Sequence, residues 1–417
     1  MRHKALTFVF MGMAVFLISS ASDVKAGENL SIKSALDEAL KSNPEISAAQ
    51  NNYKAARARV PQKFLPEDPM VEYMYDEMRA GVPDLVGKPM RSYAISQKMP
   101  FPSKLFLKSD IAAKDARILY EYYREKERDI IARVKSAYFL LWYTEKAIDV
   151  ALENKALLEQ FATSAASRYA VNKASQQDAL KAQVELAKVK NSIVLLEQRK
   201  DIVTADLNIL LNRDPRSPLA IEKDPAMPDI NATLDELSAL AKEKRPKLRA
   251  FRYAVEKGRL AYLLAWNEFL PDLSARYEQM IMDGSGGKWK GMIGMSVPIW
   301  FWAKQASGVS EMKSELEMFR ADYNTMENMA LFDVKDAFTR VKAHKKLVET
   351  YETSFVPQAE AALKASLTGY EAGQIDFLSL LDSERMLLEI KTDYYKIVSD
   401  LEIAKAGLEK GVGADLY

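Results

Sequence analysis

The chain carries one succession of sequence patterns twice, over residues 34–211 and again over residues 237–410. Each copy predicts a short helix, a proline, a second helix, two strands, a very long helix, a turn and a return helix. The copies lie about 200 residues apart, far beyond the period of solenoid repeats, so they indicate a duplicated half-structure. The matching segments are Asn43-Pro44-Glu45-Ile46 with Arg245-Pro246-Lys247-Leu248, Phe64-Leu65-Pro66 with Phe269-Leu270-Pro271, Met99-Pro100-Phe101 with Val297-Pro298-Ile299, and Tyr169-Ala170-Val171-Asn172 with Tyr370-Glu371-Ala372-Gly373.

The N-terminus has the pattern of a secretory signal peptide. Arg2 and Lys4 precede an apolar stretch from Leu6 to Ile18, and Val24-Lys25-Ala26 resembles a small-x-small cleavage site. An uncleaved anchor helix is the alternative, but the apolar stretch is shorter than the roughly 20 residues that a span needs. Export without a helical anchor leaves the periplasm, secretion or a β-barrel. The predicted units are a signal peptide over 1–26, a first repeat over 27–211, a connection over 212–232 and a second repeat over 233–417.

The composition excludes several kinds of chemistry. The chain has no cysteine, which rules out disulfides, thiolate catalysis and cysteine-ligated metals. Its 59 basic residues balance 58 acidic ones, without the basic excess of nucleic-acid binders. Once the signal is removed His344 is the only histidine, and the lysines around it predict a solvated helix face. One chain cannot assemble a catalytic triad or a multi-histidine metal site, so we expect no enzyme, no cofactor and no nucleic-acid partner.

Two exceptionally long helices dominate the prediction. Residues 104–169 contain neither proline nor glycine, and apolar residues recur in steps of three and four, as in coiled coils. At 1.5 Å per residue such a helix is roughly 100 Å long. Residues 303–369 repeat the pattern, with Pro357 expected to kink or break the helix.

The return helices, over 174–211 and 374–410, are each too short to pair with a whole long helix. Helices over 44–64 and 246–268 can stack end to end on them and supply most of the remaining length. The chain thus predicts a tall, narrow helical bundle. The proline-containing connection over 212–232 predicts irregular structure at the middle of the rods, either packed against them or acting as a flexible linker.

Two candidate hairpins interrupt the helices at matching places, over 70–99 and 273–297. Their runs of about ten residues have the length of tilted membrane-spanning strands, and apolar residues alternate with polar ones. Trp289, Trp300 and Trp302 would form an aromatic girdle at the edges of the apolar band.

Two hairpins cannot close a barrel, and an open sheet edge in lipid is forbidden. Four strands per chain therefore require several chains, and three chains would supply twelve strands. The alternative is a pair of soluble hairpins that cap a periplasmic coiled coil. Met70, Met74 and Met78 share a strand face, where their thioethers could bind Cu(I) or simply pack as apolar side chains.

Taken in order, these motifs resemble the outer membrane factor (TolC-like) family over essentially the whole mature chain. The resemblance rests on the Asn43-Pro44 and Arg245-Pro246 helix starts, the run over 96–102, and the tip segments 169–180 and 370–381. The Pro-Phe-Pro-Ser-Lys element that starts at Pro100 is similar to the heavy-metal-efflux branch. That branch often has glycine where this chain has Ser103.

The resemblance implies a mainly helical fold with a β-barrel part, closed as a homotrimer. A twelve-stranded barrel would cross the outer membrane and its lipid, and a coiled-coil α-barrel would project into the periplasm. The channel would be the passive exit duct of a tripartite efflux system, with a periplasmic adaptor and an inner-membrane RND-type pump as partners. The adaptor would meet the helix tips, which here are Val171, Asn172, Lys173, Ala372, Gly373 and Gln374.

The resemblance also implies a gate just above the tips, where this family often carries acidic residues. Asp382 matches one such position, Ser379 stands at another, and Asp178 is the equivalent of Ser379 in the first repeat. A ring of carboxylates repeated by trimer symmetry would attract cations and repel anions. Each acid is equally consistent with a solvated helix charge. A soluble periplasmic coiled-coil scaffold or adaptor is the alternative function, and an exported enzyme would need a carboxylate pair in a cleft.

Overall fold

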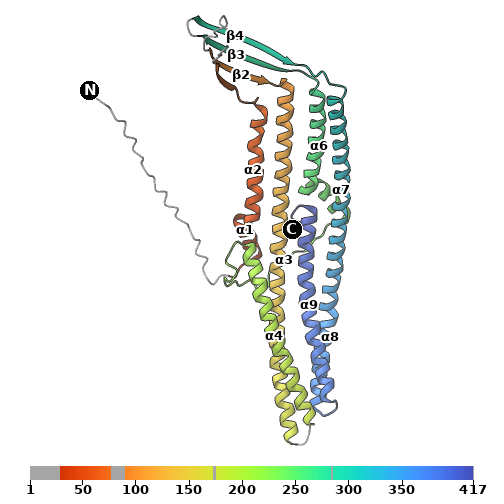
Figure 1. Ribbon diagram of the computed structural model, residues 1–417. Coiled ribbons are helices and arrows are strands. Elements are labelled where there is room, and N and C mark those ends of the chain that lie inside the picture. The colour runs from red at the N-terminus through yellow and green to blue at the C-terminus, as the bar shows by residue number, and fades with distance from the viewer. Residues whose placement is uncertain (1–28, 77–89, 172–174, 283–284, 417) are drawn as a thin grey trace, which may run out of the picture.

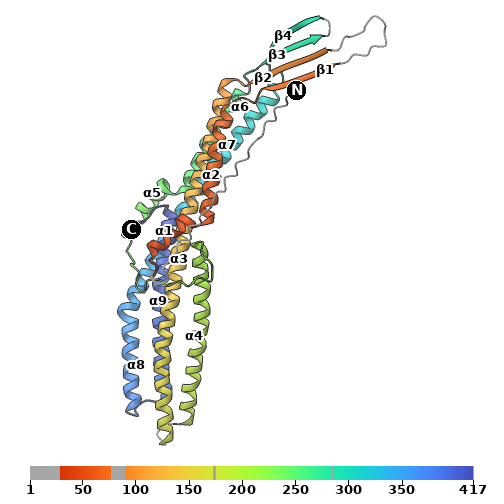
Figure 2. The same ribbon diagram turned by 90° about the vertical axis from the view of Figure 1, so that its left-hand side faces the viewer.

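The computed structural model describes residues 29–76, 90–171, 175–282 and 285–416, so the predicted signal peptide lies outside it. Long helices run the length of a tall, narrow molecule, and a small sheet lies at one end (Figure 1). Turned by 90°, the same molecule is bent, with the sheet leaning away from the lower helices (Figure 2).

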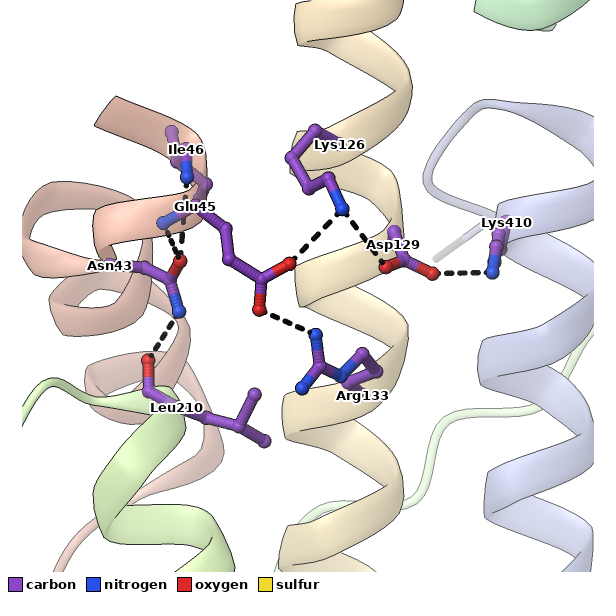
Figure 3. A network of polar contacts seen from close by, with 8 residues as sticks. All are labelled: Asn43, Glu45, Ile46, Lys126, Asp129, Arg133, Leu210 and Lys410. Carbon is purple, nitrogen blue, oxygen red and sulfur yellow. Dashed lines mark hydrogen bonds and ion pairs between the residues drawn. The ribbon is translucent and has the colours of Figure 1, made fainter. Parts of the chain in front are cut away.

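The first half of the chain forms α1 Ile32–Ser42, α2 Pro44–Phe64, β1 Met70–Asp76, β2 Met90–Met99, α3 Pro102–Ala170 and α4 Gln176–Leu210. Asn43 ends α1 and caps α2: its Oδ1 accepts the Glu45 amide at 2.9 Å, while Pro44 occupies a position that needs no amide. Its Nδ2 donates to the Leu210 carbonyl at 2.9 Å and so joins α2 to the end of α4 (Figure 3).

The second half forms α5 Leu234–Lys244, α6 Pro246–Asn267, β3 Asp272–Met282, β4 Ser285–Ser296, α7 Lys304–Thr350, α8 Val356–Glu371 and α9 Phe377–Val412. The break expected at Pro357 is confirmed, because a π turn over Tyr351–Phe355 separates α7 from α8. Proline lacks an amide and its ring displaces the carbonyl four residues back, and a wider turn accommodates both effects. The α3 helix has no internal proline and continues for 69 residues.

The α3 helix is the central element, because α2, α4, α6 and α9 all pack along it. Figure 1 shows α2 and α4 following each other along one side, and α6 and α9 along the other. Buried residues form a middle cluster around Tyr138 and Phe139, a lower cluster around Leu158 and Phe377, and a third around Val334. The core is therefore a column inside the bundle. Within the described residues, no helix is both long and apolar enough to span a membrane.

The connection between the halves is packed against the helices. Trp142 Nε1 donates to the Lys223 carbonyl at 2.9 Å, and Lys405 Nζ donates to the Pro228 carbonyl at 2.8 Å. Buried Ile221 forms a parallel β-bridge with the segment that precedes α1. These contacts hold the segment at the middle of the molecule, where the stacked helices meet.

The sheet has strand order β1-β2-β3-β4 and is antiparallel throughout. Its register aligns Val71, Ile95 and Tyr277 on one face, since alternate residues point to opposite sides of a strand. Glu72 and Glu278 follow these residues in register on the other face. Each face of the sheet thus has its own chemistry.

Candidate functional site

The sheet exposes one broad apolar face. Its members lie on all four strands and are exposed to solvent in the single chain, Ile293 to 89%. The opposite face carries the ion pair between Arg276 and Glu72, whose N–O distance is 2.7 Å. An apolar face of this size is rare on soluble proteins and marks a surface that contacts lipid or another protein. The apolar face comprises Val71, Tyr73, Tyr75, Tyr93, Ile95, Met99, Leu273, Tyr277, Ile281, Trp289, Ile293 and Met295.

The three tryptophans of the predicted girdle lie at or beside this sheet and are well exposed. Trp289, on β4, stacks on Tyr277 with ring centroids 6.3 Å apart. Trp300 and Trp302 follow β4 and pack edge to face at 5.6 Å. Tryptophan favours membrane–water interfaces, where the ring is buried in apolar surroundings and the N–H meets water.

A buried lysine fastens the sheet to the helices. Lys104, in the first turn of α3, has a side chain only 3% exposed, and its Nζ donates to Asp272 Oδ1 at 2.8 Å. The same carboxylate accepts the Phe101 amide at 3.0 Å. Ser103 donates to Asn267 Oδ1 at 2.5 Å, so the residue that replaces glycine makes its own bond to α6. The Pro-Phe-Pro-Ser-Lys element is therefore a joint between the two repeats.

At the first tip, Asp178 acts as a helix cap. Ser175 Oγ accepts the Asp178 amide at 3.1 Å, and Asp178 Oδ2 accepts the Ser175 amide at 3.2 Å, which completes a capping box at the start of α4. Val171 is exposed at the end of α3. Asn172 and Lys173, the other predicted residues of this tip, lie outside the described residues.

At the second tip the carboxylate and the hydroxyl exchange places: the acid is the N-cap and the serine follows three residues later. Asp376 is the N-cap of α9, and its Oδ1 accepts the Ser379 amide at 3.0 Å and the Ser379 hydroxyl at 2.5 Å. Ser379 and Asp178 both stand three residues after their N-caps, so the equivalence expected from the sequence holds. The acid that is missing at Ser379 is present at Asp376. Gly373 adopts a left-handed conformation with φ 73°, between Ala372 and Gln374.

An ion-pair bridge joins the two tip hairpins near the predicted gate. Arg385 of α9 donates to Glu185 of α4 at 2.5 Å, and it reaches Asp382 on its own helix at 3.4 Å. Burial acts to raise the pKa of Glu185, but the hydrogen bonds from Arg385 and Lys188 outweigh it and lower that pKa below its usual range. The charge of the exposed Asp382 is partly balanced by the same Arg385 guanidinium.

A second bridge lies closer to the tips. The Arg168 guanidinium of α3 donates to the Tyr370 carbonyl of α8 at 2.8 Å and covers the Tyr370 ring at 4.6 Å. Guanidinium over an aromatic face adds a cation–π attraction. The two bridges hold α3–α4 against α8–α9 at two levels, so separating the hairpins must break both.

No metal centre emerges among the described residues, where no group of three or more His, Cys, Asp or Glu side chains is arranged to hold an ion. Met70 and Met74 are exposed on the face that carries Glu72, while Met78 lies outside the described residues. His344 is half-buried and borders a groove of about 530 Å³ between α7 and α9, so it is less exposed than the lysines around it.

Sequence reasoning missed several residues of these sites. Asp376 could have been found, because Asp-x-x-Ser before an apolar run is a readable helix start. Lys104 ends the Pro-Phe-Pro-Ser-Lys element, but its partner Asp272 lies 168 positions away. Arg168 and Arg385 bond to residues about 200 positions away, and no local pattern shows such pairs.

Comparison with known proteins gives one family. The sequence profile of the family described as "Outer membrane efflux protein" matches the chain twice, over residues 35–213 and 237–414. The cobalt-zinc-cadmium resistance protein CzcC of Cupriavidus metallidurans is 20% identical over 395 residues, which cover 93% of this chain and 91% of CzcC.

Solved structures share the fold at lower identity. The outer-membrane channel OprN superimposes with a TM-score of 0.80 at 17% identity, covering 92% of this chain and 90% of OprN. The outer membrane protein VceC of Vibrio cholerae has a TM-score of 0.80 at 16% identity, covering 93% of this chain and 97% of VceC.

Proposed function

The chain belongs to the outer membrane efflux protein family, and we propose that three copies form the exit channel of a tripartite efflux system. Members of this family are channels of the outer membrane rather than enzymes. In the proposed system the duct performs no chemistry. It provides a sealed path and a gate, and a periplasmic adaptor and an inner-membrane RND-type pump supply the cargo and the energy.

The observation that carries this proposal is the two-faced sheet. Among the described residues, the outer edges of β1 and β4 pair with no further strand. Lipid cannot satisfy the free backbone groups of such edges, so the sheet must close with strands of other chains. Three copies would give a twelve-stranded barrel with the apolar face toward lipid and the face of Glu72 and Arg276 toward water.

The helices also offer surfaces for neighbouring copies. Exposed apolar residues recur along α4, including Leu195, Ile202 and Ile209 at intervals of seven. The α7 helix exposes Met329 and Phe332 on its own surface. A seven-residue apolar repeat is typical of coiled-coil seams, so these surfaces support a helical barrel in which α4 of one copy meets α7 of the next.

The tips suit a gate and a docking point. We propose that Val171, Ala372, Gly373 and Gln374, with the neighbouring Asn172 and Lys173, meet the adaptor, and that Asp178, Ser379 and Asp382 line the entrance. Asp376 belongs to the same group, because it supplies the acid of the second tip. Opening requires α8–α9 to move away from α3–α4, which breaks the bridges at Arg168 and Arg385.

For the cargo we propose heavy-metal cations. CzcC is named for resistance to cobalt, zinc and cadmium, and the Pro-Phe-Pro-Ser-Lys element resembles that branch of the family. Carboxylates repeated around an entrance would attract divalent cations. Deletion of the gene should sensitise cells to these metals and leave sensitivity to hydrophobic drugs unchanged. The reverse pattern would refute the cargo while leaving the channel intact.

The channel itself is tested by fractionating membranes and comparing unheated with boiled samples on SDS gels. We expect an outer-membrane band near three times the monomer mass before boiling, and cation-selective conductance in planar bilayers. A soluble monomer would refute the channel and favour the alternative, a soluble periplasmic scaffold or adaptor.

A further inference from the structure

A buried carboxyl group lies in the bundle a few turns above the tips. Glu384 of α9 is 2% exposed and borders a cavity of about 180 Å³. Asn154 and Leu157 of α3 and Leu363 of α8 line the same cavity. The carboxyl therefore lies where three helices of the two hairpins meet.

Two buried polar atoms in this cavity are poorly satisfied. Neither Glu384 Oε2 nor Asn154 Nδ2 makes a hydrogen bond of standard geometry within the described residues, and the Asn154 side chain is near enough to Glu384 only to oppose the effect of its burial. An unpaired buried polar group is costly, and an unpaired buried charge costs far more. The cavity is wide enough for water, which could satisfy a neutral acid and an amide together.

The surrounding charges do not neutralise Glu384. From α9, Lys391 pairs with Glu360 of α8 at 2.9 Å. Arg385 is engaged by Glu185 of α4 at 2.5 Å. Glu153 of α3 also borders the cavity, but it lies at the exposed rim.

Burial raises the pKa of Glu384 above its usual range, the Asn154 side chain opposes the rise, the Glu185 charge adds to it, and the Arg385 charge opposes it. No carboxylate or histidine cluster among the described residues could hold a metal there instead. A buried carboxyl beside a water-sized cavity, without a neutralising cation, is suited to hold a proton.

We propose that Glu384 is a proton-operated latch between the two tip hairpins. When neutral it stays buried and α9 packs on α3, which keeps the tips together. When ionised it must gain water, and α9 separates from α3. Its role in transport rests on the gate proposed above, but the latch can be measured without transport.

The sign of the effect follows from the raised pKa. The closed packing is fully stable below the ordinary pKa of a glutamate, near 4.3, and it loses stability as the pH rises through the raised pKa of Glu384. Ionisation can shift the balance toward the open form by at most about tenfold per pH unit. Alkaline conditions should therefore loosen the tips.

The test uses the full-length trimer and the uncharged, equally sized variant Glu384→Gln. Between about pH 5 and pH 8, the unfolding temperature of the wild type should fall relative to that of the variant, by roughly 1–3 °C for each unit by which the pKa is raised. Glu153→Gln is the matched control, because it removes an exposed charge from the rim of the same cavity. Its unfolding temperature should depend on pH as that of the wild type does.

A local readout separates the latch from general unfolding. Because the chain has no cysteine, Leu157→Cys places a single thiol at the cavity, and Leu152→Cys places one at an exposed site on the same helix. The ratio of their labelling rates removes the part of the pH dependence that the two thiols share, and the same pair of sites in Glu384→Gln shows the part due to the burial of the thiol at position 157. The ratio should rise with pH in the wild type by more than it does in Glu384→Gln.

Two results would overturn the latch: an unchanged pH slope in Glu384→Gln, or a labelling ratio that ignores pH. Neither result bears on the proposed channel, which stands or falls with the trimer and its conductance. Conversely, a protein that fails to conduct could still show the latch.

Discussion

The two halves of the molecule build the same rod but fasten it with different residues. Where α4 ends against α2, Asn212 adopts a left-handed φ of 59°, and the Asn43 amide ties the ends together. Where α9 ends against α6, Gly413 has φ 79°, and buried Arg245 pairs with Asp333 at 2.8 Å. The shared requirement is a left-handed residue that lets one helix end where the next begins. Duplication preserved this geometry, while the side chains that secure it diverged.

The second half carries the adjustable features. Its long helix is interrupted by a π turn at Tyr351–Phe355, whereas α3 is continuous. Its tip is capped by the carboxylate of Asp376 and turns at Gly373, and its return helix holds buried Glu384. We therefore expect α8–α9 to move during opening and α3–α4 to serve as the frame.

The largest expected loss of stability comes from substitutions at the helix ends in the middle of the rod. A Cβ at Gly413 would lie 2.7 Å from the Arg245 Cα and 2.9 Å from the Pro246 Cδ, in addition to the left-handed strain. Gly413→Ala should lower the free energy of unfolding by about 3 kcal/mol. Asn212→Ala meets only the strain and should cost about 1 kcal/mol. Equal losses in thermal melts of the two variants would show that the joints are not distinct.

The next effect concerns the joint between helices and sheet. Lys104→Met keeps the length of the buried side chain but leaves Asp272 and Glu268 without their cation. The loss should be about 2 kcal/mol, less than for a fully buried pair because both acids are partly exposed. Exposed Lys304, at the start of α7, is the control in the second half, and Lys304→Met should leave the melting temperature unchanged. A wild-type melt for Lys104→Met would contradict the joint.

The features that could be predicted from the sequence are those with a repeating or alternating pattern of residues. Apolar periodicity and the absence of proline predicted a helix over 104–169, and α3 spans Pro102–Ala170. Pro357 predicted the position of the break, but not that it would be a π turn. Alternation in the hairpins predicted the apolar face to which Trp289 belongs. These features are local, so neighbouring residues are enough to encode them.

What the sequence could not predict depends on packing between distant segments. The burial of Glu384 is decided by Asn154 and Leu363, which lie on other helices. Helical spacing places Glu384 on the same face of α9 as buried Phe377, Leu380 and Leu381, unlike exposed Asp382, but it does not show which side chains of the other helices surround the carboxyl. The bridge from Arg385 to Glu185 likewise depends on how the hairpins align. Titrating groups near the proposed gate could be named from the sequence, but the packing that encloses Glu384 could not.

A smaller effect tests whether the second hairpin moves against the first. Arg385→Ala removes the bridge to Glu185 and should cost about 1 kcal/mol, because Arg385 is partly exposed. It should also raise the open probability in planar bilayers. Arg340→Ala is the control, because Arg340 pairs with Asp336 within α7 and bridges no hairpins. An unchanged open probability for Arg385→Ala would mean that the bridge does not hold the gate.

The smallest effect distinguishes the two caps by pH. The hydrogen bonds from the Ser379 hydroxyl and amide lower the pKa of Asp376 below its usual range. A lowered pKa stabilises the folded form above the ordinary value near 3.9, and this support is lost as the pH falls through the lowered pKa. Acidification should therefore loosen the first turn of α9, reducing hydrogen-exchange protection factors over residues 377–381.

Asp376→Ser keeps a hydroxyl cap like that of Ser175 and should lose the acid-dependent part of this change. Ser175→Ala, in contrast, should loosen the start of α4 at every pH, because its hydroxyl does not titrate in this range. If Asp376→Ser retained the full acid response, the charge at the second tip would have no role in its cap, and the two tips would differ in sequence only.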